Sequence, residues 1–354
     1  MSTPNAIKTR ILIISDTHGA PLTYQDATTN RQRSKLTPPF EHPLPKADLL
    51  IHCGDLTVTG QMDEYHATLD MLKHIDAPTK LVIPGNHDLS LDRDYVFGHP
   101  RIYAHRNELE AQALWDEARE IWTAPLGRAR QEGVTFLDEG MHSIPLANGA
   151  KVNVYASAYT PEFMDWGFPY NKDEDRFNSP STGLSDARNV APYPVPSFTE
   201  AREPVDVLVT HGPPLGRLDA TMTGLNVGCP HLLRALMRAR PLVHCFGHIH
   251  EGWGAERVRW GEAADALVEK ACSIEDWVGG NWMAGVEGKG VETVEVDLDR
   301  ARDAHGVFVD LTEGTKGLER GRESLLVNAA IMDVHYRPIN GAWVIDLDLP
   351  TASG

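Results

Sequence analysis

Five short apolar runs, each ending in a cluster of polar residues, constrain the fold of this chain more than any other feature. Continuous apolar runs of five or six residues are typical of strands that are buried on both faces of a sheet. The sequence therefore predicts five buried strands, at RILIIS (10–15), DLLIHC (48–53), KLVIPG (80–85), VDVLVT (205–210) and LVHCF (242–246).

Helical patterns lie between these runs. Apolar residues recur at spacings of three and four over 62–72, which forms the stripe of an amphipathic helix. Pro230 begins a second pattern, with leucines on one side and arginines toward its end, as expected at the start and stop of a helix. Because strands and helices alternate, we expect an α/β (α+β layered) fold.

The remaining segments suggest one domain that spans residues 1–354. KVNVYA (151–156) reads as a further strand, which we expect to pair with GVTFLD (133–138). Residues 157–204 are rich in proline and aromatic residues and predict a long ordered loop. Residues 261–322 are charged and glycine-rich and predict an insertion, after which strands within 324–334 and 342–350 complete the domain.

Composition narrows the function classes. The 354 residues carry a formal charge of −17, which argues against a protein that binds nucleic-acid polymers by covering phosphates with a basic face. No stretch of the sequence approaches the length of a membrane span, and we expect that the first apolar run is a strand and not part of a signal peptide. The four cysteines show no paired spacing, so we expect no disulfides and a cytoplasmic protein: Cys53, Cys229, Cys245 and Cys272.

Every strand exit carries a side chain that can bind a metal. The five exits read SDTHG, GDLT, GNHD, THGPP and GHIH. In layered α/β folds, loops that follow the carboxyl ends of different strands converge on one site. Imidazoles with carboxylate or amide oxygens, and without thiolates, suit manganese, iron or zinc in a reactive site. Seven ligands with one bridging carboxylate would hold two divalent ions, and the candidates at the exits are Asp16, His18, Asp55, Asn86, His87, Asp88, His211, His248 and His250.

In this order the motifs resemble the calcineurin-like metallophosphoesterase superfamily. Further stretches, YTPEFMDWGF (159–168), THGPPLG (210–216), VGCPHLL (227–233) and FGHIHEGWG (246–254), are similar to the metallophosphoesterase-domain-containing (MPPED) branch. The resemblance covers most of residues 8–260, resumes near 326–350 and fails over 261–322. It implies a double β-sandwich flanked by helices, and cyclic nucleotide phosphodiesterase activity.

The resemblance also implies roles for single residues. The first metal would bind Asp16, His18, Asp55 and His250, and the second would bind Asp55, Asn86, His211 and His248, with Asp55 shared. Some members of the branch have glycine in place of the first histidine of G-H-x-H. Because His248 is present here, a complete two-metal site with Mn²⁺, or Fe or Zn, is expected.

The implied chemistry is hydrolysis of a small organic phosphoester. A hydroxide bridging two divalent ions would attack the phosphorus in line. His87 would donate a proton to the leaving group, since histidine can do so near neutral pH, and Asp88 would support it. Arg31, Arg33 and Arg217 could bind a substrate phosphate, although solvated loop arginines are the commoner outcome. Trp166 could stack on a base of the substrate or pack over the sheet edge with the rest of its loop.

Two other function classes remain open. The same site could serve a phosphomonoesterase, a protein phosphatase or a hydrolase of a metabolite pathway, because fold and metals do not fix the substrate. A non-enzymatic scaffold that keeps the fold is the second alternative. Loss of metal ligands would be its signature, and no ligand of the motif set is missing here.

Overall fold

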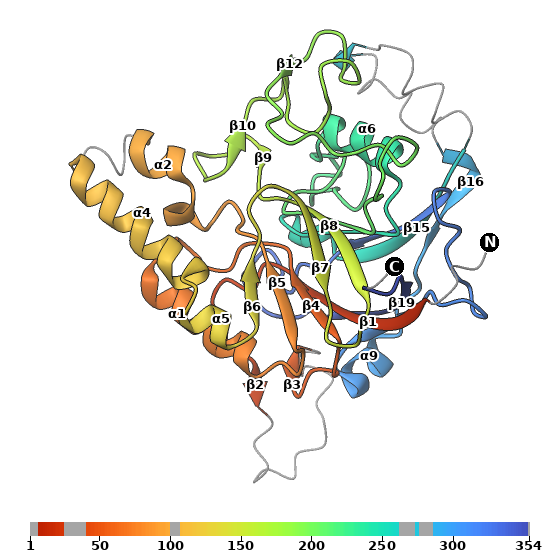
Figure 1. Ribbon diagram of the computed structural model, residues 1–354, viewed down its shortest axis with the longest axis horizontal. Coiled ribbons are helices and arrows are strands. Elements are labelled where there is room, and N and C mark those ends of the chain that lie inside the picture. The colour runs from red at the N-terminus through yellow and green to blue at the C-terminus, as the bar shows by residue number, and fades with distance from the viewer. Residues whose placement is uncertain (1–5, 25–39, 100–106, 262–272, 276–285, 353–354) are drawn as a thin grey trace.

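Two β-sheets pack face to face in the computed structural model, which describes residues 6–24, 40–99, 107–261, 273–275 and 286–352 (Figure 1). The first sheet has six strands and is mostly parallel, with β19 antiparallel to β1. In spatial order, its strands are β17 (Val307–Asp310), β19 (Trp343–Leu349), β1 (Ile7–Ile14), β4 (Leu49–His52), β5 (Thr79–Val82) and β6 (Val134–Phe136).

The second sheet has seven strands. Its central strands β18, β14, β13 and β8 are parallel, while β15 and β7 run antiparallel to their neighbours. In spatial order, its strands are β16 (Val286–Thr293), β15 (Gly254–Trp260), β18 (Glu323–Asn328), β14 (Val243–Phe246), β13 (Val207–Thr210), β8 (Lys151–Ser157) and β7 (Gly140–Pro145).

Alternate residues of each central strand face opposite layers. Ile11 and Ile13 of β1 lie in the core between the two sheets, whereas Leu12 and Ile14 face the helices outside. The runs are apolar throughout because both faces are buried. Complete burial of one such side chain contributes about 1.5–3 kcal/mol.

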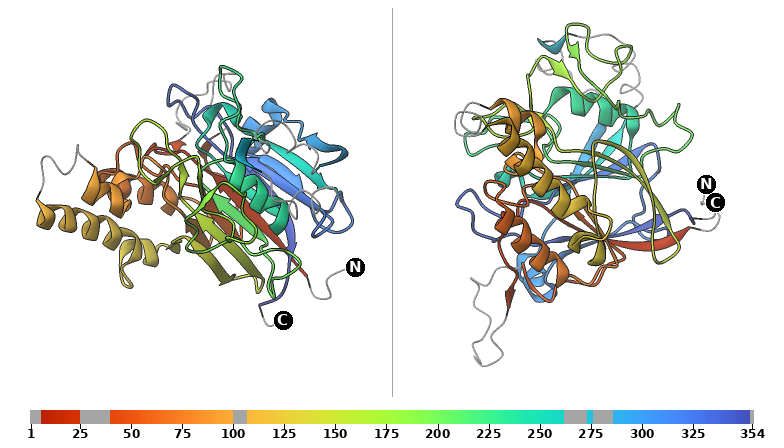
Figure 2. Two further views of the ribbon diagram at one scale, coloured as in Figure 1. Left: turned by 90° about the horizontal axis from the view of Figure 1, so that it is seen from above. Right: turned by 60° about the vertical axis from the view of Figure 1, so that its left-hand side comes forward.

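Helices cover the outer faces of the sandwich. The outer face of the first sheet carries α1 (Met62–Lys73), α4 (Glu108–Thr123) and α5 (Arg128–Gln131), and that of the second carries α6 (Pro230–Ala239). The two groups lie on opposite sides of the strands (Figure 2). The described residues also form the helical segments α2 (Arg93–Gly98), α9 (Leu298–Ala304), η1 (Leu89–Leu91) and η2 (His250–Gly252). The layered fold predicted from the sequence is confirmed.

The expected pairing between 151–156 and 133–138 is wrong. β8 pairs with β7 in an antiparallel hairpin within the second sheet, whereas β6 pairs in parallel with β5 in the first. The hairpin turns at Ala147 and Asn148, where the Gly149 N–H donates to the Leu146 carbonyl (3.0 Å). Gly149 has a φ of 89°, which glycine adopts readily. The strand β7 has only one buried residue in six, Gly140, so its sequence lacks an apolar run that would predict it.

Two long segments extend the sandwich. Residues 157–204 form an ordered loop with short bridging strands, β9 (Thr160–Pro161), β10 (Pro169–Tyr170), β11 (Glu174–Asp175) and β12 (Arg188–Asn189). The described part of 261–322 supplies α9 and one edge strand to each sheet, β16 and β17. A further short pair is β2 (Thr23–Tyr24) with β3 (Glu41–His42).

Within the ranges that the structure describes, no helix is both long and apolar enough to cross a bilayer. Cys53, Cys229 and Cys245 are free and buried, while Cys272 lies outside the described residues.

Candidate metal centre

The strand exits of both sheets meet at one edge of the sandwich. Asp16, Asp55 and Asn86 follow the parallel strands β1, β4 and β5 of the first sheet. His211 and His248 follow the parallel strands β13 and β14 of the second sheet. The site therefore lies where the carboxyl ends of the two sheets come together.

The first cluster joins Asp16, His18, Asp55 and His250. One candidate ligand atom from each side chain lies within 4.8 Å of all the others. His250 Nε2 is 3.4 Å from Asp16 Oδ1 and 3.4 Å from His18 Nε2, and His18 Nε2 is 3.7 Å from Asp55 Oδ2. The donor set of two carboxylates and two imidazoles suits a divalent ion such as Mn²⁺, Fe²⁺ or Zn²⁺.

A second cluster lies on the other side of Asp55. Asn86 Oδ1 is 2.8 Å from His211 Nε2 and 2.7 Å from His248 Nδ1. His211 Nε2 is also 3.2 Å from Asp55 Oδ1. The two oxygens of Asp55 thus face different clusters, one toward His18 and the other toward His211. All seven side chains predicted from the sequence come together around this carboxylate.

Backbone carbonyls orient three of the imidazoles. The Nδ1–H groups of His18, His211 and His250 donate to the carbonyls of Thr57 (2.9 Å), Cys53 (2.9 Å) and Asp333 (3.0 Å). In each ring this bond leaves Nε2 as the nitrogen that faces the cluster. Metal-binding histidines are commonly held by their second nitrogen in this way, so the residues present fit a pair of divalent ions.

The backbone is strained at four of the seven side chains. Asp16, His18, Asp55 and His248 have φ values of 55°, 46°, 53° and 67°, in the left-handed region. Aspartate and histidine tolerate this region better than most residues, but each instance still costs on the order of 1–3 kcal/mol. Such strain persists where the surrounding structure fixes the conformation, and it is frequent at functional sites.

Two glycines of the motifs are required by close packing. A Cβ on Gly85 would clash with the backbone and carboxylate of Asp55, and a Cβ on Gly247 would clash with the carboxylate of Asp16. Both sites therefore exclude any other residue as long as the carboxylates keep their places. The glycines of G-N-H-D and G-H-x-H make room for the ligands.

The carboxylates and imidazoles of the site shift the pKa values of one another. Burial opposes ionisation of Asp16 and Asp55, but the neighbouring histidines outweigh it, lowering the pKa of Asp16 to about 2 and that of Asp55 well below its usual range. Burial likewise opposes the charge on His211 and His250. The two carboxylates outweigh it and raise the pKa of each histidine to about 9. The site thus holds two carboxylates that are ready to bind cations.

His87 borders the clusters without belonging to either. Its backbone N–H donates to Asp55 Oδ1 (2.9 Å), and its ring Nδ1–H donates to the Val58 carbonyl (2.7 Å). The ring lies 4.8 Å from His18 between centroids, and it stacks on Trp166 at 3.9 Å with an interplanar angle of 24°. His87 Nε2 is therefore the ring nitrogen that remains for contact with a bound molecule.

Asp88 binds the loops together behind the site. Its carboxylate accepts hydrogen bonds from the backbone N–H groups of Leu56 (3.1 Å), Thr57 (3.0 Å) and Gly85 (2.7 Å), and from the Thr57 hydroxyl (2.7 Å). Burial, with the charge of Asp55 nearby, raises the pKa of Asp88 to about 7. These contacts give Asp88 a positioning role on the two loops that carry Asp55 and His87.

The expected substrate residues fall in different places. Trp166 lies at the site, stacked on His87. Arg217 is buried, with its guanidinium 3.3 Å from the carboxylate of Glu256 on β15. Arg31 and Arg33 lie outside the described residues. Contact of these four side chains with a substrate stays a prediction.

The sequence motifs missed Tyr336 and Asp333. The Tyr336 ring packs against His18 (4.7 Å between centroids), His250 (5.7 Å) and His87 (6.1 Å). Burial and the site carboxylates raise the pKa of Tyr336. Asp333 holds His250 through its backbone carbonyl, and a main-chain contact leaves no signature in the sequence.

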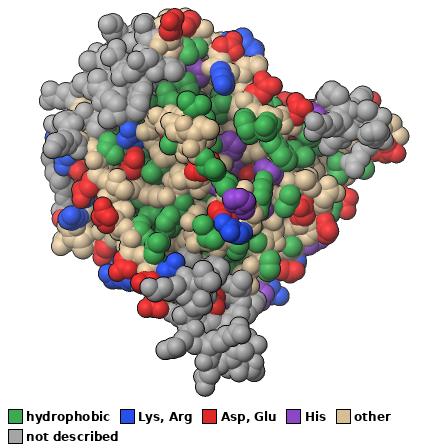
Figure 3. Space-filling model, turned by 180° about the vertical axis from the view of Figure 1, so that it is seen from behind, with side chains coloured by type: hydrophobic (Ala, Val, Ile, Leu, Met, Phe, Trp, Pro, Cys, Tyr) green, Lys and Arg blue, Asp and Glu red, His purple; other side chains and the backbone are tan. Residues whose placement is uncertain are grey.

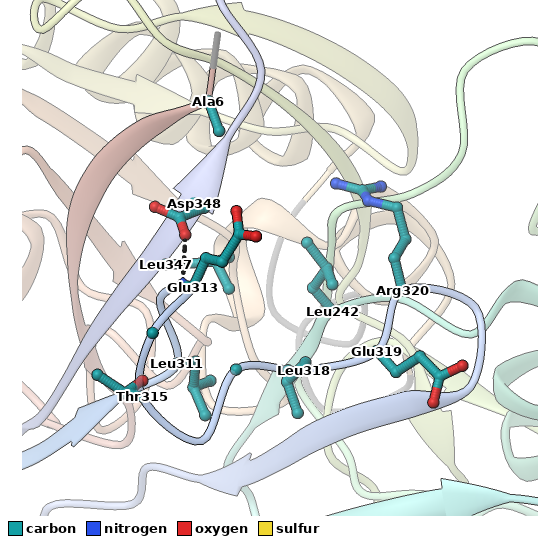
Figure 4. A pocket seen from close by; sticks show the side chains of 12 residues that line it. Ala6, Leu242, Leu311, Glu313, Thr315, Leu318, Glu319, Arg320, Leu347 and Asp348 are labelled. Carbon is teal, nitrogen blue, oxygen red and sulfur yellow. Dashed lines mark hydrogen bonds between the residues drawn. The ribbon is translucent and has the colours of Figure 1, made fainter. Parts of the chain in front are cut away.

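The site is open to the surface, since the side chains of His248 and His250 are only partly buried. Histidine side chains gather near the middle of one face of the molecule, with hydrophobic side chains around them (Figure 3). A separate cavity of about 550 Å³ lies at the opposite ends of the strands, near Ala6, Leu242 and Asp348 (Figure 4). Strand polarity thus separates that cavity from the candidate metal centre.

The calcineurin-like phosphoesterase family model matches residues 9–252, and the chain belongs to this family. The matched region contains all seven candidate ligands together with His87 and Asp88. Family membership and the two-sheet structure confirm the predicted calcineurin-like fold.

Curated relatives match over part of their length. The human metallophosphoesterase domain-containing protein 1 is 28% identical over 253 residues, 70% of this chain and 62% of that protein. A UPF0046 protein of Caenorhabditis elegans is 28% identical over 60% of this chain and 48% of its own length. A probable rhamnogalacturonate lyase C of Emericella nidulans is 31% identical over 61% of this chain and 16% of that protein. The chain thus spans less than two thirds of each of these relatives.

A solved structure of purple acid phosphatase from yellow lupin seeds also matches. It is 10% identical to this chain, covers 98% of this chain and 55% of its own, and has a TM-score of 0.37. The family assignment rests on the sequence match and on the sheets described above.

Proposed function

We propose that this chain is a two-metal phosphodiesterase that hydrolyses cyclic nucleotides or another small organic phosphodiester. The observation that carries the proposal is the position of Asp55, whose two carboxylate oxygens face His18 and His211 in separate clusters. A carboxylate shared in this way is suited to hold two cations a few ångströms apart. Mn²⁺ is the proposed ion, with Fe or Zn as alternatives.

The bound ions would activate a water molecule as nucleophile near neutral pH and polarise the phosphoryl oxygens. Asp16, Asp55 and one bound hydroxide would contribute three negative charges against the four positive charges of two divalent ions, so the loaded centre would carry a net charge of about +1 and attract an anionic phosphoester. A phosphodiester carries one negative charge, which balances the net positive charge of the centre without exceeding it. This charge balance supports a diester as the substrate.

His87 is the proposed general acid. Its Nδ1–H is committed to the Val58 carbonyl, which fixes the ring and leaves Nε2 toward the site. Stacking on Trp166 holds the ring from its other face. A histidine in this setting can give a proton to the departing alkoxide, which typically accelerates the reaction by about 10²–10⁴.

The setting proposed for this reaction is the cytoplasm, with a free small molecule as the substrate. Three buried free thiols support a reducing compartment. The formal charge of −17 disfavours a nucleic-acid polymer as the substrate.

A substrate panel tests the proposal. The chelator-treated protein is reloaded with Mn²⁺, Fe²⁺ or Zn²⁺ and assayed on bis-p-nitrophenyl phosphate, 2′,3′-cyclic AMP, 3′,5′-cyclic AMP, p-nitrophenyl phosphate and a phosphoserine peptide. We expect kcat/KM for at least one diester to exceed that for both monoesters by about tenfold or more, equivalent to 1.4 kcal/mol or more.

Two results would contradict the proposal in different ways. Higher kcat/KM for p-nitrophenyl phosphate or the peptide would assign the same centre to a phosphomonoesterase or protein phosphatase. Protein that binds two metals but hydrolyses nothing would indicate a scaffold.

A further inference from the structure

Tyr336 occupies the rim of the candidate metal centre and has no role in the proposed chemistry. Its side chain comes from the loop between β18 and β19, about 80 residues beyond the last motif. The ring contacts three histidines of the site, yet the residue remains 48% exposed. An aromatic ring that is packed on one side and open on the other offers a surface to a bound molecule.

The backbone of Tyr336 is held by the turn that carries it. The Tyr336 N–H donates to the Asp333 carbonyl (2.9 Å), which also accepts from His250 Nδ1 (3.0 Å). The Asp333 carboxylate closes the turn by accepting from the N–H groups of His335 (2.9 Å) and Arg337 (3.0 Å). The Asp333 carbonyl therefore orients the His250 imidazole and also holds the backbone from which the Tyr336 ring extends.

A second aromatic side chain, Trp166, lies beside His87, which the Tyr336 ring also faces. Trp166, from the 157–204 loop, stacks on His87 at 3.9 Å, and Tyr336 lies 6.1 Å from the same ring. A substrate whose leaving group reaches His87 Nε2 must place the organic part of that group close to these rings. Aromatic side chains of this kind stack well on planar groups such as nucleobases.

We propose that the Tyr336 ring forms the wall of the site against which a planar aromatic group of the substrate, such as a nucleobase, packs. This inference deepens the proposed function and rests on its metal centre. It narrows the small phosphodiesters to those that carry an aromatic group. The contact is made by the ring, and the phenol hydroxyl is not required.

Equilibrium binding separates this proposal from the proposed reaction. Calorimetry on the Mn²⁺-loaded protein measures the Kd of adenosine 5′-monophosphate and of ribose 5-phosphate, which share the phosphate and sugar and differ in the base. Tyr336→Phe keeps the ring, whereas Tyr336→Asn and Tyr336→Leu remove it. Asparagine tolerates the φ of 57° at this position, which favours folding of that variant.

The expected result is specific to the base. Tyr336→Asn and Tyr336→Leu bind adenosine 5′-monophosphate about tenfold more weakly than the wild type, and Tyr336→Phe stays within about twofold. Binding of ribose 5-phosphate is unchanged in all variants. Metal content and Tm, measured on the same samples, show that each variant is folded and loaded.

Three results would overturn the proposal. They are equal binding of both ligands by the wild type, parallel weakening of both ligands in the ring-deleted variants, or a loss in Tyr336→Phe as large as that in Tyr336→Asn. None of these depends on turnover. If the wild type hydrolyses no phosphodiester, the proposed function fails while the binding ratio still decides the role of Tyr336.

Discussion

Each imidazole that faces the first cluster is fixed by a main-chain partner, and this determines what single residues can do. His18 and His250 present Nε2 because their Nδ1–H groups donate to the carbonyls of Thr57 and Asp333. His87 is held in the same way by Val58, but its ring lies beside the cluster. Removing this side chain should therefore affect proton transfer more than metal binding.

Substitution His87→Ala tests the general-acid role. We expect kcat for a cyclic nucleotide, whose alkoxide leaving group needs a proton, to fall by about 10²–10⁴, while bis-p-nitrophenyl phosphate loses less than about tenfold. p-Nitrophenolate leaves readily without protonation. Steady-state kinetics on both substrates and metal analysis of the variant provide the measurement.

The matched control is His142→Ala on β7, a histidine whose Nε2 bonds to the Asp138 carbonyl. It should leave both rates unchanged. An equal loss on both substrates, or a variant emptied of metal, would show that His87 holds the centre together.

At the residue scale, the sequence predicted side chains that follow apolar runs. Asp16, Asp55 and His211 could be found because each stands directly after a recognisable strand, within a motif. Tyr336 could not, because it follows β18 by eight residues and its segment has no metal-binding pattern. The backbone carbonyls that accept from the histidine rings could not be predicted either, since every residue type supplies a carbonyl.

At the scale of elements, the loops after β4 and β5 act as one unit. Asp88 connects them by accepting from the N–H groups of Leu56, Thr57 and Gly85, and it is fully buried. The sequence suggested a supporting role for Asp88 in catalysis. Its contacts indicate that any support acts through the positions of Asp55 and His87.

Asp88→Asn should destabilise this pair of loops. An amide NH₂ placed among several N–H donors leaves at least one buried donor without an acceptor, which costs about 1–3 kcal/mol. We expect the free energy of unfolding of the metal-free protein, measured by urea denaturation, to fall by that amount, and metal affinity to fall with it. Asp63→Asn on the exposed face of α1 is the control.

A different pattern would refute the positioning role. If Asp88→Asn lost activity while its stability and metal content matched those of the wild type, the carboxylate would act on the substrate directly.

Strands were predictable where both of their faces are buried, but their pairing was not. β1, β4, β5, β13 and β14 appear as apolar runs, and the structure places all of them within the two sheets. β7 was not predicted from the sequence because its exposed residues alternate with partly buried ones. β8 was therefore assigned the wrong partner, since the sequence between 138 and 151 offered no competing strand.

At the scale of the whole molecule, the candidate metal centre links the two sheets. Asp16, Asp55 and Asn86 come from the first sheet, and His211 and His248 from the second. Ions held between them would connect both halves of the sandwich, so metal binding should stabilise the fold as a unit. A ligand present at about 100 times its Kd contributes about 2.7 kcal/mol.

The stabilisation of the fold by bound metal should depend on pH. The site carboxylates raise the pKa of His211 and His250 from 6.5 to about 9, despite burial, so the stability that these charged histidines give the metal-free protein is lost as pH rises from about 6.5 to 9. Metal binding needs neutral imidazoles and becomes stronger over the same range. The increase in Tm caused by Mn²⁺ should therefore be larger at pH 8.5 than at pH 6.

Thermal denaturation with Mn²⁺ and with chelator at both pH values measures this difference. A metal-induced shift that is constant from pH 6 to 8.5, or larger at pH 6, would contradict the assignment of these histidines as ligands.

The central claim is that two metal ions share Asp55, and a count of bound metal in Asp55→Asn tests it most directly. Mass spectrometry of dialysed, Mn²⁺-reconstituted protein should find two ions per chain in the wild type and well under one in Asp55→Asn, because both clusters lose the same carboxylate. A variant that keeps two ions, or loses only one, would show that Asp55 does not join the two clusters.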